Sequence, residues 1–234
     1  MIRGFVRLMA LLGVLVWQFG DARPAHSETR ISASNTVFMG AVEIEMDELL
    51  PLPAWESVLI KLAAEEQAVL LCRDGRRCDD RNIARLAELV SKLAGATRAA
   101  KIQAVNEYFN SWPYTPDQDQ FGRLDLWQSP LGFMRRSGDC EDYAIAKYFT
   151  LRLLGLRDKD MRIVVSYDRG KQEAHAVLAV HHNGRFYLLD NRSQEIRQQS
   201  RVPDLVPKYA VNAKSRWLFV PGTEIGNQRP AASR

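Results

Sequence analysis

The segment Gly138–Leu154, with the sequence GDCEDYAIAKYFTLRLL, predicts the helix that decides the fold. Residues three or four positions apart share one face of a helix, and on this one they are Cys140, Ala144, Tyr148 and Leu151. Gly155 follows as a natural helix stop. Cys140 therefore lies in the first turn, where free N–H groups and the helix dipole favour a reactive thiolate.

After this helix the hydrophobic period changes to two, which is typical of strands. The pattern predicts strands over 161–167, 174–182, 185–190 and 216–220. Asn183-Gly184 separates two of them and is typical of a two-residue hairpin turn. The predicted order is helices first, then the helix that contains Cys140, and then an antiparallel sheet. This order indicates an α+β domain.

Upstream of Gly138 the chain alternates helical segments with turn-rich ones. Helical spacing predicts helices over 54–71, 80–94 and 97–110, and a short helix from Ser129-Pro130 to Met134. Residues 112–122 are rich in turn formers and predict a loop. Residues 28–53 are mixed in composition and end in Pro51-Leu-Pro53, which predicts an N-terminal arm or loop.

The hairpin turn sets a register that brings a histidine close to a carboxylate. A two-residue turn at 183–184 pairs position 182 with 185 and position 177 with 190. His175 and Asp190 then share a face as diagonal neighbours, which permits a hydrogen bond between their side chains. Taken singly, a buried structural cysteine, a strand-end histidine and a turn aspartate are each ordinary. Together Cys140, His175 and Asp190 predict a catalytic triad of thiolate, proton carrier and orienting carboxylate.

Acidic residues crowd the candidate nucleophile. Asp139, Glu141 and Asp142 flank Cys140, and nearby carboxylates disfavour a thiolate. Two interpretations stand at this point: the three could bind a hard cation such as Ca²⁺, or they could simply favour a helix N-terminus. The segment Asp117–Gly122 hints at a calcium loop, but its ligand spacing departs from the EF-hand pattern at Phe121 and Gln128.

The first 27 residues predict a secretory signal peptide. Arg3 and Arg7 give a positive start, an apolar run reaches Trp17, and Ala25-His-Ser27 has small residues at the cleavage positions. The run is short for a membrane span, and no second one occurs, so a soluble mature protein is expected. The formal charge of +4 includes arginines of this leader and gives no reason to expect nucleic-acid binding.

Three cysteines occur in the whole chain, Cys72, Cys78 and Cys140. In an oxidising compartment Cys72 and Cys78 could close a small disulfide loop, and Cys140 is then the unpaired thiol. The alternative is that all three remain reduced.

Three short motifs resemble one known family. The blocks 138–147, 174–179 and 189–191, read as GDCEDYAIAK, AHAVLA and LDN, are similar to those of the bacterial transglutaminase-like cysteine proteinases of the LapG type. Trp112-Pro-Tyr114 and the segment from Asp125 to Pro130 fit the same resemblance, which covers roughly residues 100–191.

The resemblance implies a papain/transglutaminase-like fold, which we expect over 54–225. We expect a disordered tail over 226–234. The same resemblance implies that Cys140, His175 and Asp190 form the triad, and that calcium is bound by Asp139, Glu141 and Asp142. The backbone N–H of Cys140 is expected in the oxyanion hole, and Trp127 or Gln128 could add a side-chain donor.

The resemblance also implies a biological setting. Proteases of this type lie in the periplasm and cut a large biofilm adhesin near its N-terminus at a pair of alanines. An inner-membrane receptor for cyclic di-GMP holds the protease when the messenger is abundant. Two rival functions stay open: a transglutaminase-like acyl transferase that uses the same triad, and a non-enzymatic calcium-dependent binding module.

Overall fold

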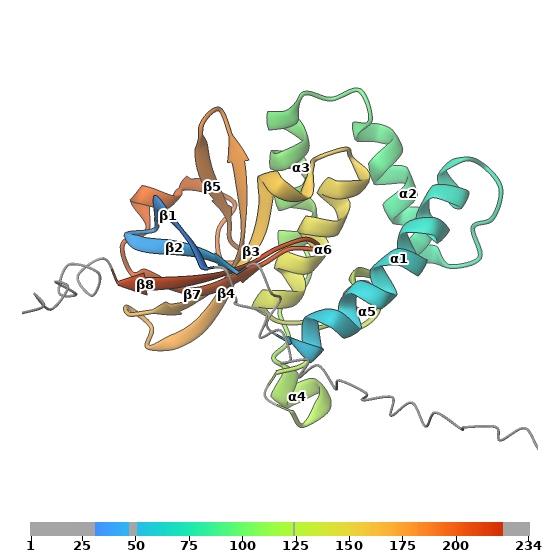
Figure 1. Cartoon of the computed structure of the whole chain (residues 1–234). Helices are drawn as coiled ribbons and strands as arrows, with labels where there is room; N and C mark the ends of the chain where they lie inside the picture. The colour runs from blue at the N-terminus through green and yellow to red at the C-terminus, as the bar shows by residue number, and fades with distance from the viewer. Residues whose placement is uncertain (1–30, 47–50, 124, 222–234) are drawn as a thin grey trace, which may run out of the picture.

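The computed structural model describes residues 31–46, 51–123 and 125–221. The predicted signal peptide at 1–27 and the predicted tail at 226–234 lie outside the described residues. In the described part, a group of helices packs beside one curled antiparallel sheet (Figure 1). This arrangement is the α+β architecture that the sequence predicts.

The sheet has eight strands in the spatial order β1-β2-β8-β7-β3-β4-β5-β6. Their bounds are β1 Ile31–Phe38, β2 Ala41–Met46, β3 Met161–Asp168, β4 Glu173–His182, β5 Arg185–Leu189, β6 Arg197–Gln198, β7 Leu205–Val211 and β8 Arg216–Pro221. The predicted hairpin register is confirmed, since His182 pairs with Arg185 and Leu178 with Leu189. The β4–β5 ladder ends at that last pair, one position before Val177 would face Asp190.

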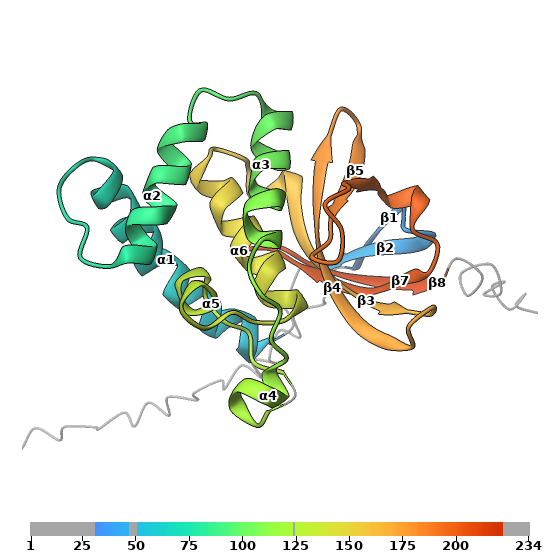
Figure 2. The same cartoon turned by 180° about the vertical axis from the view of Figure 1, so that it is seen from behind.

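The helices are α1 Pro53–Arg73, α2 Arg81–Leu93, α3 Arg98–Asn110, α4 Asp117–Phe121, α5 Pro130–Arg136 and α6 Cys140–Leu153. Helices α3 and α6 lie next to the sheet, and α1 and α2 lie farther out (Figures 1 and 2). Nearly all of α6 is buried, because α3 and α5 pack on one side of it and strands β3 and β4 on the other. None of the helices in the described residues combines the length and the apolar character of a bilayer-crossing segment.

Both faces of the central strands are buried. One core lies between helices and sheet and includes Leu178 and Val180, and a second lies on the other face and includes Val177 and Ala179. Alternate residues of β4 therefore enter different cores. This double burial explains why 176–180 reads as an unbroken apolar run, AVLAV.

The loop predicted over 28–53 is wrong for residues 31–46, which form β1 and β2. The two strands pair with each other, and β2 pairs with β8, so this segment is part of the sheet. Met39-Gly40 makes the turn, with positive φ at both residues. The strand signal is weak because serine, asparagine and glutamate interrupt the apolar residues of this segment.

Strands β6 and β7 and helix α4 are also absent from the sequence prediction. Pro207 lies inside β7, and a proline argues against a strand assignment. The β3–β7 pairing shifts register between Val165 and Ser166, next to the position where Pro207 pairs. The proline is therefore accommodated at an irregularity, where a missing N–H costs least.

Of the two alternatives for Cys72 and Cys78, the structure shows the disulfide. Cys72 at the end of α1 is bonded to Cys78, with their Cα atoms 4.7 Å apart. Cys140 is the free thiol of the described residues.

Candidate active site

Cys140 is the first residue of α6, and a glycine determines how the chain enters that helix. Gly138 lies so close to Asp142 that an added Cβ would be 2.0 Å from the Asp142 Oδ2. The carbonyl of Gly138 also accepts a hydrogen bond of 2.9 Å from the N–H of Thr115. The motif therefore needs glycine at this position, because the loop before α6 packs directly on the helix's own side chain.

His175 and Asp190 are in direct contact. His175 Nε2 lies 2.9 Å from Asp190 Oδ1, and both side chains are almost fully buried. The same Oδ1 accepts a bond of 3.0 Å from the backbone N–H of Arg192. These bonds to the charged carboxylate lower the pKa of Asp190 despite its burial. The second ring nitrogen of His175, Nδ1, is buried and has no hydrogen-bond partner among the described residues.

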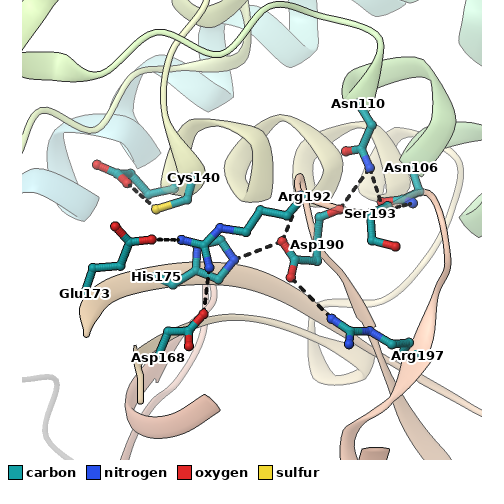
Figure 3. A network of polar contacts seen from close by, with 11 residues as sticks. Asn106, Asn110, Cys140, Asp168, Glu173, His175, Asp190, Arg192, Ser193 and Arg197 are labelled. Atoms are coloured by element: carbon teal, nitrogen blue, oxygen red, sulfur yellow. Dashed lines mark hydrogen bonds and ion pairs between the residues drawn. The ribbon is translucent and has the colours of Figure 1, made fainter. Parts of the chain in front are cut away.

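Cys140 and His175 line one cleft of about 310 Å³ between α6 and the sheet. Tyr114 and Trp127 line it on the helical side, and Val165 and Tyr209 line it from β3 and β7. In Figure 3 the Cys140 sulfur lies beside the His175 ring, with Asp190 on the opposite side of that ring. The structure thus places Cys140 and His175 in one cleft and Asp190 in contact with His175.

The environment of the thiol differs from the sequence expectation. The N-terminus of α6 favours a thiolate, but burial raises the pKa of Cys140. The neighbouring carboxylates of Glu141 and Asp139 raise it further, and Cys140 Sγ lies 3.2 Å from Glu141 Oε2. The N–H of Ala176 donates to the sulfur and opposes the shift. Burial and the neighbouring carboxylates therefore both oppose the thiolate that a nucleophilic cysteine needs.

The acidic residues form a buried cluster, and its full membership could not be predicted from their spacing in the sequence. Ligand atoms of Asp139, Cys140 and Glu141 lie within 4.8 Å of one another, and so do those of Asp117, Asp139 and Asp142. Burial raises the pKa of Asp117 to about 6 and of Asp142 to about 8. Burial and the neighbouring carboxylates also raise the pKa of Glu141.

Two oxygens of this cluster mark it as a place for a cation. The Oδ1 atoms of Asp117 and Asp139 are buried without a hydrogen-bond donor among the described residues. Buried carboxylate oxygens without donors are costly, and a hard divalent ion satisfies them. An all-oxygen set of this kind suits Ca²⁺ or Mg²⁺ better than zinc. The residues present therefore fit a hard cation.

Asp142 and Gln128 form a buried hydrogen-bonded pair beside the cluster. The backbone N–H and the side-chain Nε2 of Gln128 each donate a bond of 2.7 Å to the Asp142 carboxylate. Gln128 Nε2 also donates to the carbonyl of Ser137 at 2.9 Å. The side-chain amide nitrogen of Gln128 is thus engaged in two hydrogen bonds, to Asp142 and to Ser137. Trp127 lines the cleft, and its Nε1–H donates to Asp125 Oδ1 at 2.8 Å.

Asp117 is the main site residue that sequence reasoning set aside. The spacing of the segment Asp117–Gly122 does not match an EF-hand loop. The Asp117 carboxylate instead reaches the cluster from the start of the short helix α4. The N–H of Leu126 donates to the other oxygen of Asp117 and holds it there. The acidic pair Asp117–Asp119 was the available signal, but it gave no indication of the partner segment.

The fold and the cleft define a cysteine peptidase with a papain/transglutaminase-like fold. A family model described as bacterial transglutaminase-like cysteine proteinase matches residues 70–222. The chain belongs to this family. Among curated proteins, none matches the chain.

Solved structures of LapG from Legionella pneumophila are similar to this chain. The calcium-bound LapG is 30% identical, with a TM-score of 0.57, over 65% of this chain and 87% of that chain. A second LapG structure is 28% identical, with a TM-score of 0.56, over 71% and 92%. An EGTA-treated LapG is 27% identical, with a TM-score of 0.55, over 70% and 92%.

Proposed function

We propose that this chain is a calcium-dependent cysteine endopeptidase in which Cys140, His175 and Asp190 are the catalytic triad. One observation carries the proposal. Asp190 accepts from His175 Nε2, and the other ring nitrogen is buried, has no hydrogen-bond partner in the part of the chain that the structure describes, and belongs to a residue that lines the cleft with Cys140. A histidine oriented by a carboxylate on one side and open to a thiol on the other is the arrangement that activates a nucleophile.

The reaction follows from these positions. His175 Nδ1 takes the thiol proton while Cys140 Sγ attacks the scissile carbonyl carbon and forms the S–C bond. The C–N bond then breaks, and the proton passes from His175 to the leaving amine. Water, deprotonated by His175, attacks the thioester, and the S–C bond breaks to return the thiol. The N–H of Cys140 has no intrahelical acceptor in the first turn of α6 and is suited to stabilise the oxyanion.

Calcium would be held by Asp139 and Glu141, with Asp117 and Asp142 beside them. The bound ion supplies positive charge that lets these buried carboxylates ionise together and lowers their effect on the thiol. The calcium-bound and EGTA-treated forms of LapG support this choice of ion. Beside the cluster, the two hydrogen bonds from Gln128 to Asp142 hold the loop before α6 against that helix.

The family resemblance supports the rest of the proposal. The substrate is a large cell-surface adhesin, cut near its N-terminus at a di-alanine site, and the mature enzyme acts in the periplasm. An inner-membrane cyclic di-GMP receptor sequesters it there through that receptor's periplasmic domain.

The test is cleavage of a fluorogenic peptide with a central Ala-Ala pair, with calcium and with EGTA. Cys140→Ala should abolish cleavage and leave the thermal unfolding temperature nearly unchanged. Asp190→Ala should lower kcat, because His175 loses its orienting bond. Wild-type rates in Cys140→Ala would rule the proposal out. A primary amine added to the assay separates hydrolysis from acyl transfer, since only a transferase incorporates the amine.

A further inference from the structure

The backbone ladder does not hold His175 and Asp190 together. The β4–β5 pairing ends at Leu178 and Leu189, whereas His175 lies three residues before that pair on β4. On its other side, His175 pairs with Ser166 of β3. Asp190 follows the end of β5, so the two side chains meet beyond the end of the β4–β5 ladder. Contacts outside the ladder hold the loop after β5: Asn110 Nδ2 donates to the Asp190 carbonyl at 2.9 Å, and a second contact joins this loop to the β3–β4 hairpin.

Arg192 makes that contact. Its guanidinium donates to Asp168 Oδ2 at 2.8 Å and to the carboxylate of Glu173, and these residues lie on opposite sides of the β3–β4 hairpin. Its backbone N–H donates to Asp190 Oδ1 at 3.0 Å. Figure 3 shows the Arg192 guanidinium between the carboxylates of Asp168 and Glu173, in front of the His175 ring. One residue thus binds the hairpin through its side chain and the Asp190 carboxylate through its backbone.

Asp168 also stabilises the turn of the β3–β4 hairpin. Asp168 Oδ1 accepts from the N–H groups of Gly170 and Lys171 at 3.0 and 3.1 Å. Oδ1 therefore closes the turn, and Oδ2 is free to accept from Arg192. A planar guanidinium suits this task, because its rigid fork can bind two carboxylates at once, which an ammonium does less well. The Arg192 side chain is 26% exposed and the Asp168 side chain 12%, so the Asp168 bond is partly shielded from water.

We propose that Arg192 is a positioning residue that joins the β3–β4 hairpin to the Asp190 loop and so keeps the Asp190 carboxylate on His175. The proposal rests on the function proposed above for the His175–Asp190 pair. Arg192 itself is not among the residues that line the cleft with Cys140. It acts on catalysis through Asp190 and not by contact with the substrate.

The test compares Arg192→Met and Arg192→Lys with Lys171→Met as the matched control. Lys171 is an exposed cation on the same hairpin, and its loss changes the local charge equally. Arg192→Met should lower kcat for the Ala-Ala peptide about 10–100-fold, because a displacement near 1 Å has that effect on a catalytic group. KM should change less than about threefold, Arg192→Lys should recover part of kcat, and Lys171→Met should match the wild type. A raised KM with kcat unchanged would overturn the proposal, since it would mean substrate contact.

A double-mutant cycle with Asp168→Asn identifies the bridge as the cause. Asparagine keeps Oδ1 as the acceptor for the turn but places an amide where Oδ2 accepted from Arg192. If Arg192 acts through Asp168, the double variant should be no slower than Arg192→Met alone. Fully additive effects would contradict the bridge.

A readout independent of cleavage separates this inference from the proposed function. In protein with ¹⁵N-labelled histidine, the His175 Nε2–H proton bound to Asp190 should give a protected NMR signal. Arg192→Met should broaden or remove the signal, and Lys171→Met should keep it. If the wild type cleaves nothing, the proposed function fails, while the NMR comparison still decides the role of Arg192. An unchanged signal in Arg192→Met would refute that role.

Discussion

Gly138→Ala should damage the site through a collision that can be measured on the structure. The new Cβ would lie 2.0 Å from Asp142 Oδ2 and 2.8 Å from both Cβ and Cγ of Asp142. Carbon atoms in contact normally lie about 3.5–4.0 Å apart, so one partner must retreat by roughly 1 Å. Asp142 cannot retreat without cost, because it is fully buried and Gln128 donates two bonds of 2.7 Å to it.

The expected loss combines two effects. Overpacking of a buried position costs about 1–3 kcal/mol. Loss of one hydrogen bond to a buried carboxylate adds about 1.5–3 kcal/mol. A total of about 2.5–6 kcal/mol corresponds to a fall in Tm of roughly 5–24 °C for a domain of this size.

The assay is thermal unfolding of Gly138→Ala across a calcium titration. Calcium that binds only the folded chain raises Tm in proportion to the logarithm of its concentration above Kd. Gly138→Ala should start lower and should need more calcium to begin that rise, because Asp142 belongs to the same cluster as Asp139. Gly95→Ala is the control, since its Cβ would meet nothing within 4 Å. Equal Tm values and equal calcium curves for Gly138→Ala and the wild type would refute the reasoning.

Three further changes test other parts of the structure. Lys147 is buried with no hydrogen-bond partner for Nζ among the described residues, and burial lowers its pKa to about 7. The unfolded chain keeps this proton up to about pH 10.4, so the contribution of Lys147 to wild-type stability should rise with pH between the two values. Lys147→Met should abolish that rise and be the more stable protein at pH 6 in urea denaturation; equal pH slopes would contradict this. Asp117→Asn should raise the calcium concentration needed for thermal stabilisation at least about tenfold, and without calcium it should be no less stable, since it removes a buried charge. Replacing Cys72 and Cys78 together by serine should cost about 2 kcal/mol in urea denaturation and leave peptide cleavage unchanged; a parallel loss of cleavage would link that loop to the site.

The sequence predicts the site better where local chemistry sets geometry. Asn183-Gly184 admits only a few hairpin turns, so the register that brings His175 to Asp190 follows from two residues. The helix that begins at Cys140 is likewise signalled by its periodicity and by Gly155. Local signals of this kind do not depend on the rest of the fold.

Other parts of the fold depend on contacts between distant segments. Strand β7 contains Pro207, which only the irregular pairing with β3 accommodates. Asp117 joins the acidic cluster because α4 folds back on the loop before α6, and no spacing rule within one segment predicts that contact. The raised pKa of the Cys140 thiol also depends on burial, which the position at a helix N-terminus does not reveal.

The most direct test of the central claim is the alkylation rate of Cys140 by iodoacetamide as a function of pH. It would be measured with calcium, with EGTA, and in His175→Ala. In the metal-free chain, burial and the carboxylates of Glu141 and Asp139 raise the thiol pKa, so alkylation with EGTA should be slow at neutral pH. With calcium, alkylation should be fast near pH 7 and should depend on His175. A single midpoint near the ordinary value of about 8.5, unaffected by calcium and by His175→Ala, would contradict the account.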